Sequence, residues 1–431
     1  MLTRHMIAEW RLWCVELALL GLFMVLCLPA IFMLTKGEGG LASDAVNFHL
    51  PQINEFRENP SSLLDYKATA TTLPFYHFLM GVLARLFGVN EVANDSLGFR
   101  CVHFLLSGSG LVAFIHFLSR TVTLRTMVVL SLPLITSWYV VSGAIYFGTD
   151  GPGLSLVLIL LTFAVVSCTR SASLSGLLFL IAVTRHLFLP FAAAAVIIRA
   201  WPISTFEGFM TRIVLILMPA TVIVAVYVVH WGGLTPPGIV ANLNPKGIFP
   251  YALLGHLAVA GLWGGTFCLL RVETMLTYLR QRSVLLCLAA TGLAVFILWV
   301  LSPSGYSIDG GRFGAYIWSV AKLTTPGDHS VAVLLAALFG VWGIFLIGFD
   351  CHKRGLMPIE MVSLSIFLLT LMLTYASYQR YSEPLCVASF AIATSRAIGR
   401  DSVMWLKYVP LMLLSVMGVA TCLFRMYARY A

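Results

Sequence analysis

The sequence predicts an all-α fold, a bundle of about 11–13 transmembrane helices, on three observations. Hydrophobic residues make up 59% of the 431 residues and charged residues only 10%. A soluble protein carries about 25% charged residues, so this chain has too few charges to cover a water-facing surface. The mean hydropathy is +0.92, and apolar runs recur along the whole chain. We therefore expect one integral, multi-pass membrane domain over residues 1–431.

The first apolar run, Cys14–Leu34, is long enough to span a bilayer, which takes about 20 residues. Arg4 and Arg11 precede it, and positive residues favour the cytoplasmic side, so the amino terminus is expected inside. Several later runs are short, which broken or tilted helices would explain. The later runs are Cys101–Leu118, Met127–Phe147, Pro152–Cys168, Leu174–Thr184, Leu187–Ile198, Ile213–Val229, Tyr251–Leu270, Val284–Leu301, Val331–Phe349, Met361–Tyr375, Leu385–Thr394 and Pro410–Leu423.

One long polar segment lies between predicted spans. It covers residues 35–100 and includes "SDAVNFHLPQINEFRENPSSLLDYKATATTLPFYHF" (Ser43–Phe78). With the amino terminus inside, this loop lies on the extracytoplasmic side. Pro74–Gly88 is apolar but short and contains Arg85, so we expect an interfacial helix there rather than a crossing. Counting it as a crossing would place the later basic loops outside.

The positive charges are distributed as membrane orientation requires. The net charge is +9, but the bases stand between hydrophobic runs rather than in a stripe, which argues against binding to nucleic acid. The nine cysteines form no CxxC pair, so we interpret them as small apolar residues in helices. The loops expected on the cytoplasmic side contain Arg120, Arg125, Arg170, Arg199, Arg212, Arg271, Arg280, Arg282, Lys353, Arg354, Arg396, Arg400 and Lys407.

Polar residues near the predicted membrane edge are the candidates for a functional site. A charge inside the membrane costs roughly 2.5–3.5 kcal/mol on insertion scales and is usually functional. Asp44 follows the first helix, and His49 and Gln52 come next at spacings that share a helix face. Asp150 ends the third span in "IYFGTDGPG". The structural alternatives are a helix cap in a solvated loop for Asp44, and an N-cap with glycines making the turn for Asp150.

Two further groups of polar residues interrupt later apolar sequence. Arg185 and His186 lie in "FLIAVTRHLFLPF", between two short apolar runs. A turn is the alternative interpretation, but "TRHLF" itself lacks turn residues. Arg380 lies in "SYQRYSEP", where a loop with a salt bridge to Glu383 is the alternative interpretation. The predicted topology places these residues on the same face as the first loop.

This placement suits sugar transfer from a lipid-linked phosphate. A carboxylate can take the proton of an acceptor hydroxyl as its oxygen attacks the anomeric carbon, an effect worth about 10²–10⁴-fold. The leaving phosphate gains negative charge, which Arg and Lys stabilise. A single phosphate carries less charge than a nucleotide diphosphate, so a divalent metal is less necessary.

The same residues resemble the GT-C glycosyltransferases, multi-span enzymes that use polyprenyl-phosphate sugars and carry a catalytic Asp in the first extracytoplasmic loop. "FHLPQ" (Phe48–Gln52) and "DYKATATTLP" (Asp65–Pro74) are most similar to the dolichyl-phosphate-glucose-dependent alpha-1,2-glucosyltransferase family. "FGTD", "TRHLF" and "SYQRYSEP" resemble further motifs of that family, in the same order. The family's acidic pair is not preserved, because Ala45 and Val46 occupy its positions, and "RH" lacks the family's "QTN".

The resemblance implies an inverting hexosyltransferase, and we expect neither a cofactor nor metal ligands. Its donor would be a polyprenyl-phosphate-linked sugar, and its acceptor a glycan or lipid-linked oligosaccharide. Asp44 would be the general base, while His49, Gln52 and Asp150 would position the acceptor. The residues expected to hold the donor phosphate are Lys67, Arg185, His186, Arg380 and Tyr381.

Two other functions are alternatives. A transporter or lipid flippase would place charges at mid-membrane depth and show internal symmetry, whereas this sequence shows charges at one edge and no repeat. A non-catalytic GT-C homologue would explain the altered acidic pair. We expect the bacterial cytoplasmic membrane as the location, with the endoplasmic reticulum membrane as the alternative.

Overall fold

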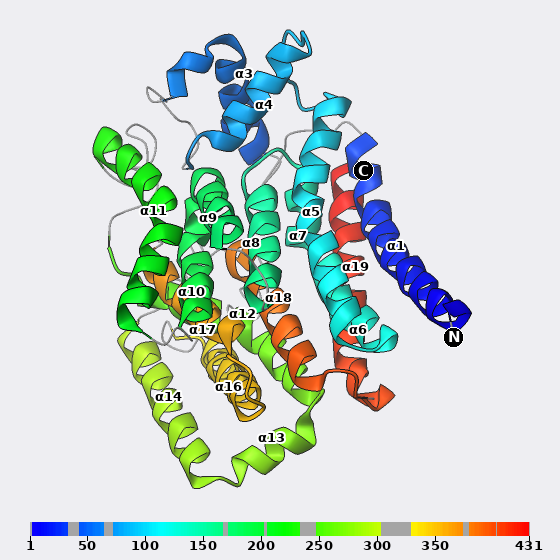
Figure 1. Cartoon of the computed structure of the whole chain (residues 1–431), viewed down its shortest axis with the longest axis vertical. Helices are drawn as coiled ribbons and strands as arrows, with labels where there is room; N and C mark the ends of the chain where they lie inside the picture. The colour runs from blue at the N-terminus through cyan, green and yellow to red at the C-terminus, as the bar shows by residue number, and fades with distance from the viewer. Residues whose placement is uncertain are drawn as a thin grey trace. The chain divides into compact units, whose positions relative to one another are not determined.

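Every regular element of the described chain is helical, as the sequence predicts (Figure 1). The structure is a computed structural model. It describes residues 2–32, 43–63, 72–166, 171–201, 205–232, 247–302, 329–373, 379–401 and 403–430.

Contacts between residues divide the chain into two compact units. The first unit comprises Met1–Arg120, Ser131–Leu243 and Leu414–Ala431, and the second comprises Thr121–Leu130 and Asn244–Leu413. The elements up to residue 232 are α1 (Leu2–Phe32), η1 (Ala45–His49), α3 (Leu50–Glu58), η2 (Pro60–Leu63), α4 (Phe75–Leu86), α5 (Leu97–Thr121), α6 (Leu124–Ile135), α7 (Trp138–Ile145), α8 (Asp150–Val165), α9 (Ser171–Arg185), η3 (His186–Phe188), α10 (Leu189–Ala200) and α11 (Phe206–Trp231). The later elements are α12 (Pro250–Leu269), α13 (Val272–Leu279), α14 (Arg282–Leu301), α16 (Val331–Lys353), α17 (Ile359–Thr370), η6 (Leu371–Leu373), α18 (Gln379–Ile398), η7 (Trp405–Tyr408) and α19 (Val409–Tyr430).

Eight helices in the described ranges are long and apolar enough to cross a membrane, which indicates an integral multi-pass protein. They are α1, α5, α9 with α10, α11, α12, α14, α16, and η7 with α19. The number is below the predicted 11–13 because some short apolar runs do not form separate crossings. Leu174–Thr184 and Leu187–Ile198 belong to one stretch of 30 residues, Ser171–Ala200, broken only by the short η3.

Other predicted crossings are broken or short. Met127–Phe147 forms α6 and α7, which are bent by 62° and would make a ninth span if counted together. Pro133 lies inside α6 and Ser137 starts α7 in extended conformation, which accounts for a break at this point. Two further runs form α8 and α17, which fall in the class of shorter apolar helices.

The polar segment after α1 folds into short helices. α3 packs against α4, and a Cβ added at Gly81 of α4 would lie 2.7 Å from the carbonyl oxygen of Ile53, so the two helices touch through backbone. α4 has 12 residues and is therefore about 18 Å long, too short to cross a hydrocarbon core of about 30 Å. Its length fits the interfacial helix predicted at Pro74–Gly88.

A buried arginine fixes the end of α1. Arg100, near the start of α5, is 2% exposed and donates hydrogen bonds to the carbonyl oxygens of Ala30 (2.6 Å) and Ile31 (2.9 Å). These carbonyls belong to the last turn of α1, and the carbonyls of a last helical turn need partners from outside the helix. The guanidinium satisfies them and complements the negative end of the helix dipole.

In the second unit, α12 and α16 form the most extensive helix–helix contact, and glycines make it close. A Cβ added at Gly261 of α12 would overlap the carbonyl oxygen of Ala336, and one at Gly340 of α16 would overlap that of Leu257. Small residues at such positions let two backbones approach, which is a common way to pair helices in membranes.

We predict that Gly261→Val destabilises the chain by about 1–3 kcal/mol or more, because the branched side chain pushes α12 away from α16. The measurement is the unfolding free energy in mixed detergent micelles. Gly265→Val is the matched control, since Gly265 lies in the same helix and a Cβ there meets nothing within 4 Å. Equal destabilisation by both substitutions would contradict the packing role of Gly261.

Candidate functional site

The structure places six of the sequence-predicted site residues in the first unit, near helix ends. These are Asp44, His49, Gln52, Asp150, Arg185 and His186. Arg380 and Tyr381 belong to the second unit, and Lys67 lies outside the described residues.

Asp44 directly precedes a turn of π-helix, Ala45–His49. The N–H of Leu50 donates to the carbonyl oxygen of Ala45, which is the i to i−5 bond of that geometry. Asp44 has helical backbone angles, and its side chain makes no capping hydrogen bond to η1 in the described structure. The π turn places Asp44 and His49 about one helical turn apart on one side of the segment.

Asp150 and Arg185 form an ion pair that is largely shielded from water. The Arg185 Nε lies 2.8 Å from the Asp150 Oδ1, and the two side chains are 8% and 21% exposed. Asp150 is the first residue of α8 and Arg185 the last residue of α9. An acid at a helix start and a base at a helix end each complement the local dipole. This arrangement reduces the cost of burying both charges.

Two glycines in "TDGPG" act through close packing. The alternative interpretation of the sequence is that Asp150 is an N-cap and that the glycines make the turn. In the structure, the N-cap residue of α8 is Thr149. Gly151 and Gly153 lie within α8 and are not among the positive-φ glycines of the described chain. A Cβ at Gly153 would lie 2.6 Å from the Cβ of Arg185. Gly153 thus lets the stem of Arg185 lie against the first turn of α8.

His49 pairs with a histidine that the sequence interpretation missed. The His49 Nδ1 lies 2.8 Å from the His77 Nε2. The two ring planes are within 11° of parallel and their centroids are 5.1 Å apart, so the rings meet edge to edge through these nitrogens. In such a bond one nitrogen donates and the other accepts. A Cβ at Gly148 would lie 3.4 Å from the His49 ring, which places His49 against the segment before Asp150.

His77 links this pair to Arg185. His77 is fully buried in α4, and α4 contacts α9. Burial lowers the pKa of the His77 imidazole well below its usual range, and the neighbouring His49 and Arg185 lower it further. His77 is therefore neutral at pH 7.

Tyr76, the neighbour of His77, joins α4 to α5 and α7. The His103 Nε2 lies 2.9 Å from the carbonyl oxygen of Gly143. A carbonyl only accepts, so this nitrogen carries the proton and the His103 Nδ1 is the acceptor. The Tyr76 hydroxyl lies 2.8 Å from that Nδ1 and donates to it. Burial raises the pKa of Tyr76, so the hydroxyl keeps its proton.

The sequence contained a signal for Tyr76 and His77. They form a polar dipeptide within the otherwise apolar "PFYHFLMGVLARLFG", and the prediction of an interfacial helix left them without a role.

The remaining predicted residues have separate surroundings. Gln52 is buried and donates to the Glu55 Oε2 at 2.6 Å. His186 starts η3, and its Nδ1 is buried without a hydrogen-bond partner among the described residues. In the second unit, the Arg380 guanidinium lies 5.2 Å from the centre of the Tyr381 ring. These two residues lie in the first turn of α18 rather than in the loop considered from the sequence.

Comparison of the chain with protein-family models, with curated proteins and with solved structures finds no match. In the described ranges, no group of three or more His, Cys, Asp or Glu is placed to hold a metal ion.

We predict that Asp150→Asn lowers the unfolding free energy by about 3–5 kcal/mol, because it leaves the Arg185 cation buried without its partner. Asp150→Asn combined with Arg185→Gln should recover part of this loss in a double-mutant cycle. Glu58→Gln is the control: it breaks the Arg57–Glu58 pair, in which Glu58 is 69% exposed, and should cost about 1 kcal/mol or less. A negligible coupling energy between Asp150 and Arg185 would contradict the assignment.

We also predict a pH dependence of stability that arises from His77. The unfolded chain binds a proton at this imidazole near pH 6.5, whereas the folded chain excludes it. The unfolding free energy therefore falls as the pH drops below 6.5. His77→Phe should make this fall shallower, measured as unfolding free energy at pH 5–8 in the same micelles. An unchanged slope would show that His77 takes up its proton as readily in the folded state.

Proposed function

We propose that the chain is an inverting membrane glycosyltransferase of the GT-C type, which moves a hexose from a polyprenyl-phosphate donor to an extracytoplasmic glycan or lipid-linked acceptor. The observation that carries the proposal is the Asp150–Arg185 ion pair in the neighbourhood of the His49–His77 pair. Arg185 acts electrostatically on His77, and His49 follows Asp44 on the same helical segment. A carboxylate can act as the base in transfer from a sugar phosphate, and a guanidinium can stabilise the leaving phosphate.

In this mechanism Asp44 is the general base. It takes the proton of the acceptor hydroxyl as that oxygen bonds to the anomeric carbon from the face opposite the phosphate. The bond between the anomeric carbon and the phosphate oxygen breaks at the same time, so the configuration inverts. His49 and Gln52 position the acceptor by hydrogen bonds from the same helical segment as Asp44.

The leaving phosphate gains negative charge as its bond to the sugar breaks, and cations aimed at that charge stabilise it. Asp150 holds the Arg185 guanidinium in an ion pair at its Nε. A guanidinium that is held in place loses less freedom when it binds a phosphate. His186, which follows Arg185 in the same unit, is the other residue proposed to contact the donor phosphate.

The test uses the full chain in vesicles with a radiolabelled polyprenyl-phosphate hexose and a mixture of lipid-linked oligosaccharides. We predict that Asp44→Asn lowers the transfer rate by about 10²-fold or more, because the acceptor hydroxyl loses its proton acceptor. Asp95→Asn, an exposed acid before α5, is the control and should keep the wild-type rate.

Equal rates for wild type and Asp44→Asn would remove Asp44 from the role of base. Movement of labelled lipid across the vesicle membrane without any transfer to an acceptor would favour a flippase instead.

A further inference from the structure

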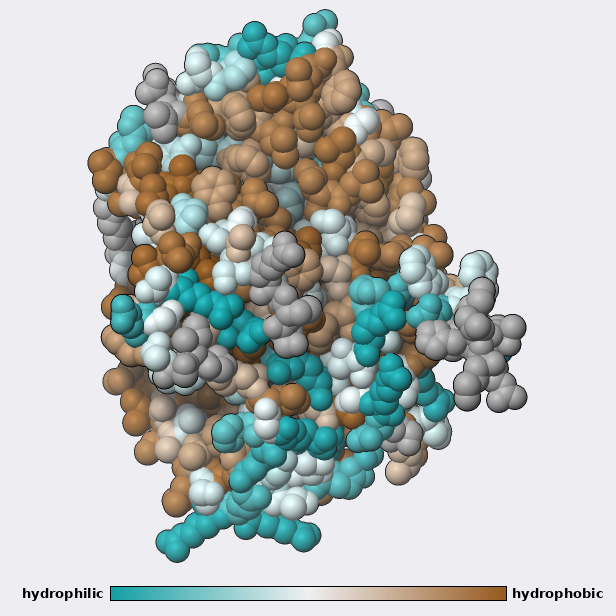
Figure 2. Space-filling view, in the orientation of Figure 1, coloured by the Kyte–Doolittle hydropathy of each residue, from teal (hydrophilic) through white to brown (hydrophobic). Residues whose placement is uncertain are grey.

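One end of the second unit gathers an excess of positive charge. Residues 271–282, 350–360 and 396–407 contain eight Arg and Lys but four Asp and Glu. Buried contacts bring these segments together, because Arg271 donates to the Asp350 carboxylate and to the carbonyl oxygen of Ala397. Figure 2 shows hydrophilic side chains over the α13 end of this unit, at the bottom of the view.

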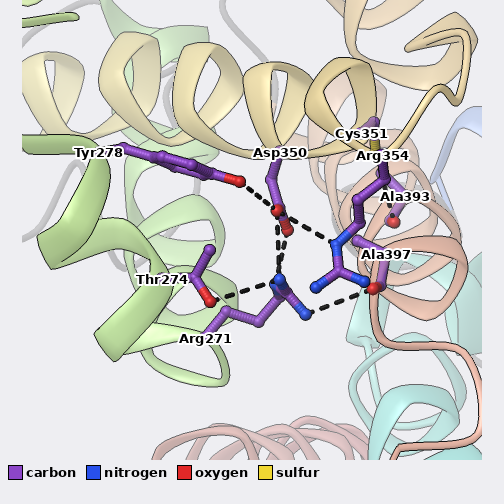
Figure 3. A network of polar contacts seen from close by, with 8 residues as sticks. All are labelled: Arg271, Thr274, Tyr278, Asp350, Cys351, Arg354, Ala393 and Ala397. Carbon is purple, nitrogen blue, oxygen red and sulfur yellow. Dashed lines mark hydrogen bonds and ion pairs between the residues drawn. The ribbon is translucent and has the colours of Figure 1, made fainter. Parts of the chain in front are cut away.

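Three of the four acids have cationic partners within this end of the unit. Asp350 is 1% exposed and its Oδ2 lies 2.5 Å from the Arg271 Nε, while the Tyr278 hydroxyl donates to its Oδ1 at 2.8 Å (Figure 3). The Arg354 Nε also approaches the Oδ1, at 3.4 Å. One carboxylate therefore holds two guanidinium groups, which leaves a net positive charge at this point.

The other two paired acids are Glu360 and Glu273. Glu360 is fully buried and accepts from the Arg396 Nη1 at 2.7 Å. Glu273 pairs with Lys407. The fourth acid, Asp401, is exposed beside the exposed Arg400.

The positive charge that faces outward is carried by a defined set of exposed bases. Arg354 has a side chain 39% exposed, and Figure 3 shows its two terminal nitrogens on the side of the guanidinium away from Asp350. The exposed bases of this end are Arg280, Arg282, Lys353, Arg354 and Arg400.

Large apolar side chains are exposed on the same elements. Leu276 of α13 is 53% exposed, and Trp405 and Leu406 of η7 are 57% and 56% exposed. The pair between Lys407 and Glu273 ties η7 to α13. Exposed Trp and Leu beside a cluster of Arg and Lys are typical of segments that lie in the membrane interface.

We propose that these exposed bases, together with Leu276, Trp405 and Leu406, form a surface that binds the headgroups of anionic phospholipids. We call it the α13 surface. Its bases attract the headgroup phosphate, and its apolar side chains enter the acyl chains beside it. The apolar part identifies a lipid rather than free phosphate as the ligand, because a soluble anion gains nothing from Leu276 or Trp405. Asp350 holds α13, α16 and α18 in the arrangement that presents the bases.

The experiment measures lipid selectivity of the full chain in vesicles with spin-labelled phosphatidylglycerol and, separately, spin-labelled phosphatidylcholine. A base near a membrane surface contributes about fivefold in affinity for an anionic lipid. We predict that the wild-type chain prefers phosphatidylglycerol by about fivefold or more at low salt. The variant R280Q/R282Q/K353Q should lose most of this preference. All three bases are exposed, so the fold should be retained, as a wild-type unfolding midpoint would verify.

The matched control is R11Q/R85Q/R425Q, which removes the same charge from three exposed positions of the first unit. It should keep the preference for phosphatidylglycerol. An unchanged preference in R280Q/R282Q/K353Q would overturn the proposal, and so would an equal loss in the control, which would assign the effect to net charge. Displacement of the labelled lipid by free inorganic phosphate at millimolar concentration would overturn the choice of a lipid as the ligand. Sugar transfer is not needed for the readout, so the outcome is independent of the proposed function.

Discussion

The ion pair between Asp150 and Arg185 fixes the geometry on which the candidate site depends. Removing two charges from water is costly, and a buried pair persists only where further interactions offset that cost. Here the positive start of α8 faces the acid and the negative end of α9 faces the base, so both helix dipoles contribute. Gly153 supplies the space, because any side chain at that position would collide with the stem of Arg185. The pair therefore joins the start of one apolar helix to the end of the next at a defined distance.

The segment after α1 is attached to this point through neutral polar contacts. Hydrogen bonds from Tyr76 to His103 and from His103 to the Gly143 carbonyl join α4 to α5 and α7. Because a carbonyl oxygen only accepts, it determines which atom donates in each bond. The His49–His77 bond joins the π turn to α4. A neutral His77 fits beside Arg185, whereas a charged one would be repelled by it. Acid, imidazole and guanidinium groups from three separate stretches of sequence thus share one neighbourhood in the first unit.

The second unit is held together by glycine-mediated helix packing and by buried ion pairs. Its centre is the α12–α16 pair, where glycines let the backbones touch, and lipid offers no hydrophobic driving force for such pairing. Its charged end relies on Asp350 and Glu360, which are almost completely buried and each hold arginine. These two carboxylates neutralise the interior of that end and leave other bases on the outside. The buried ion pairs of this end are structural, whereas its exposed bases are the ones that we propose bind a ligand.

The sequence by itself determined the class of the protein, because a chain with so few charges can only be stable with lipid around its helices. It also indicated Asp150 and Arg185, since isolated charges in apolar sequence need a reason. It overestimated the number of crossings, because hydropathy does not tell whether two short runs such as Leu174–Thr184 and Leu187–Ile198 continue one another. Only the tertiary structure decided that Asp150 pairs with Arg185, that His77 belongs beside His49, and that the glycines of "TDGPG" serve packing. Each of these depends on distances between segments far apart in the chain, which periodicity and composition do not encode.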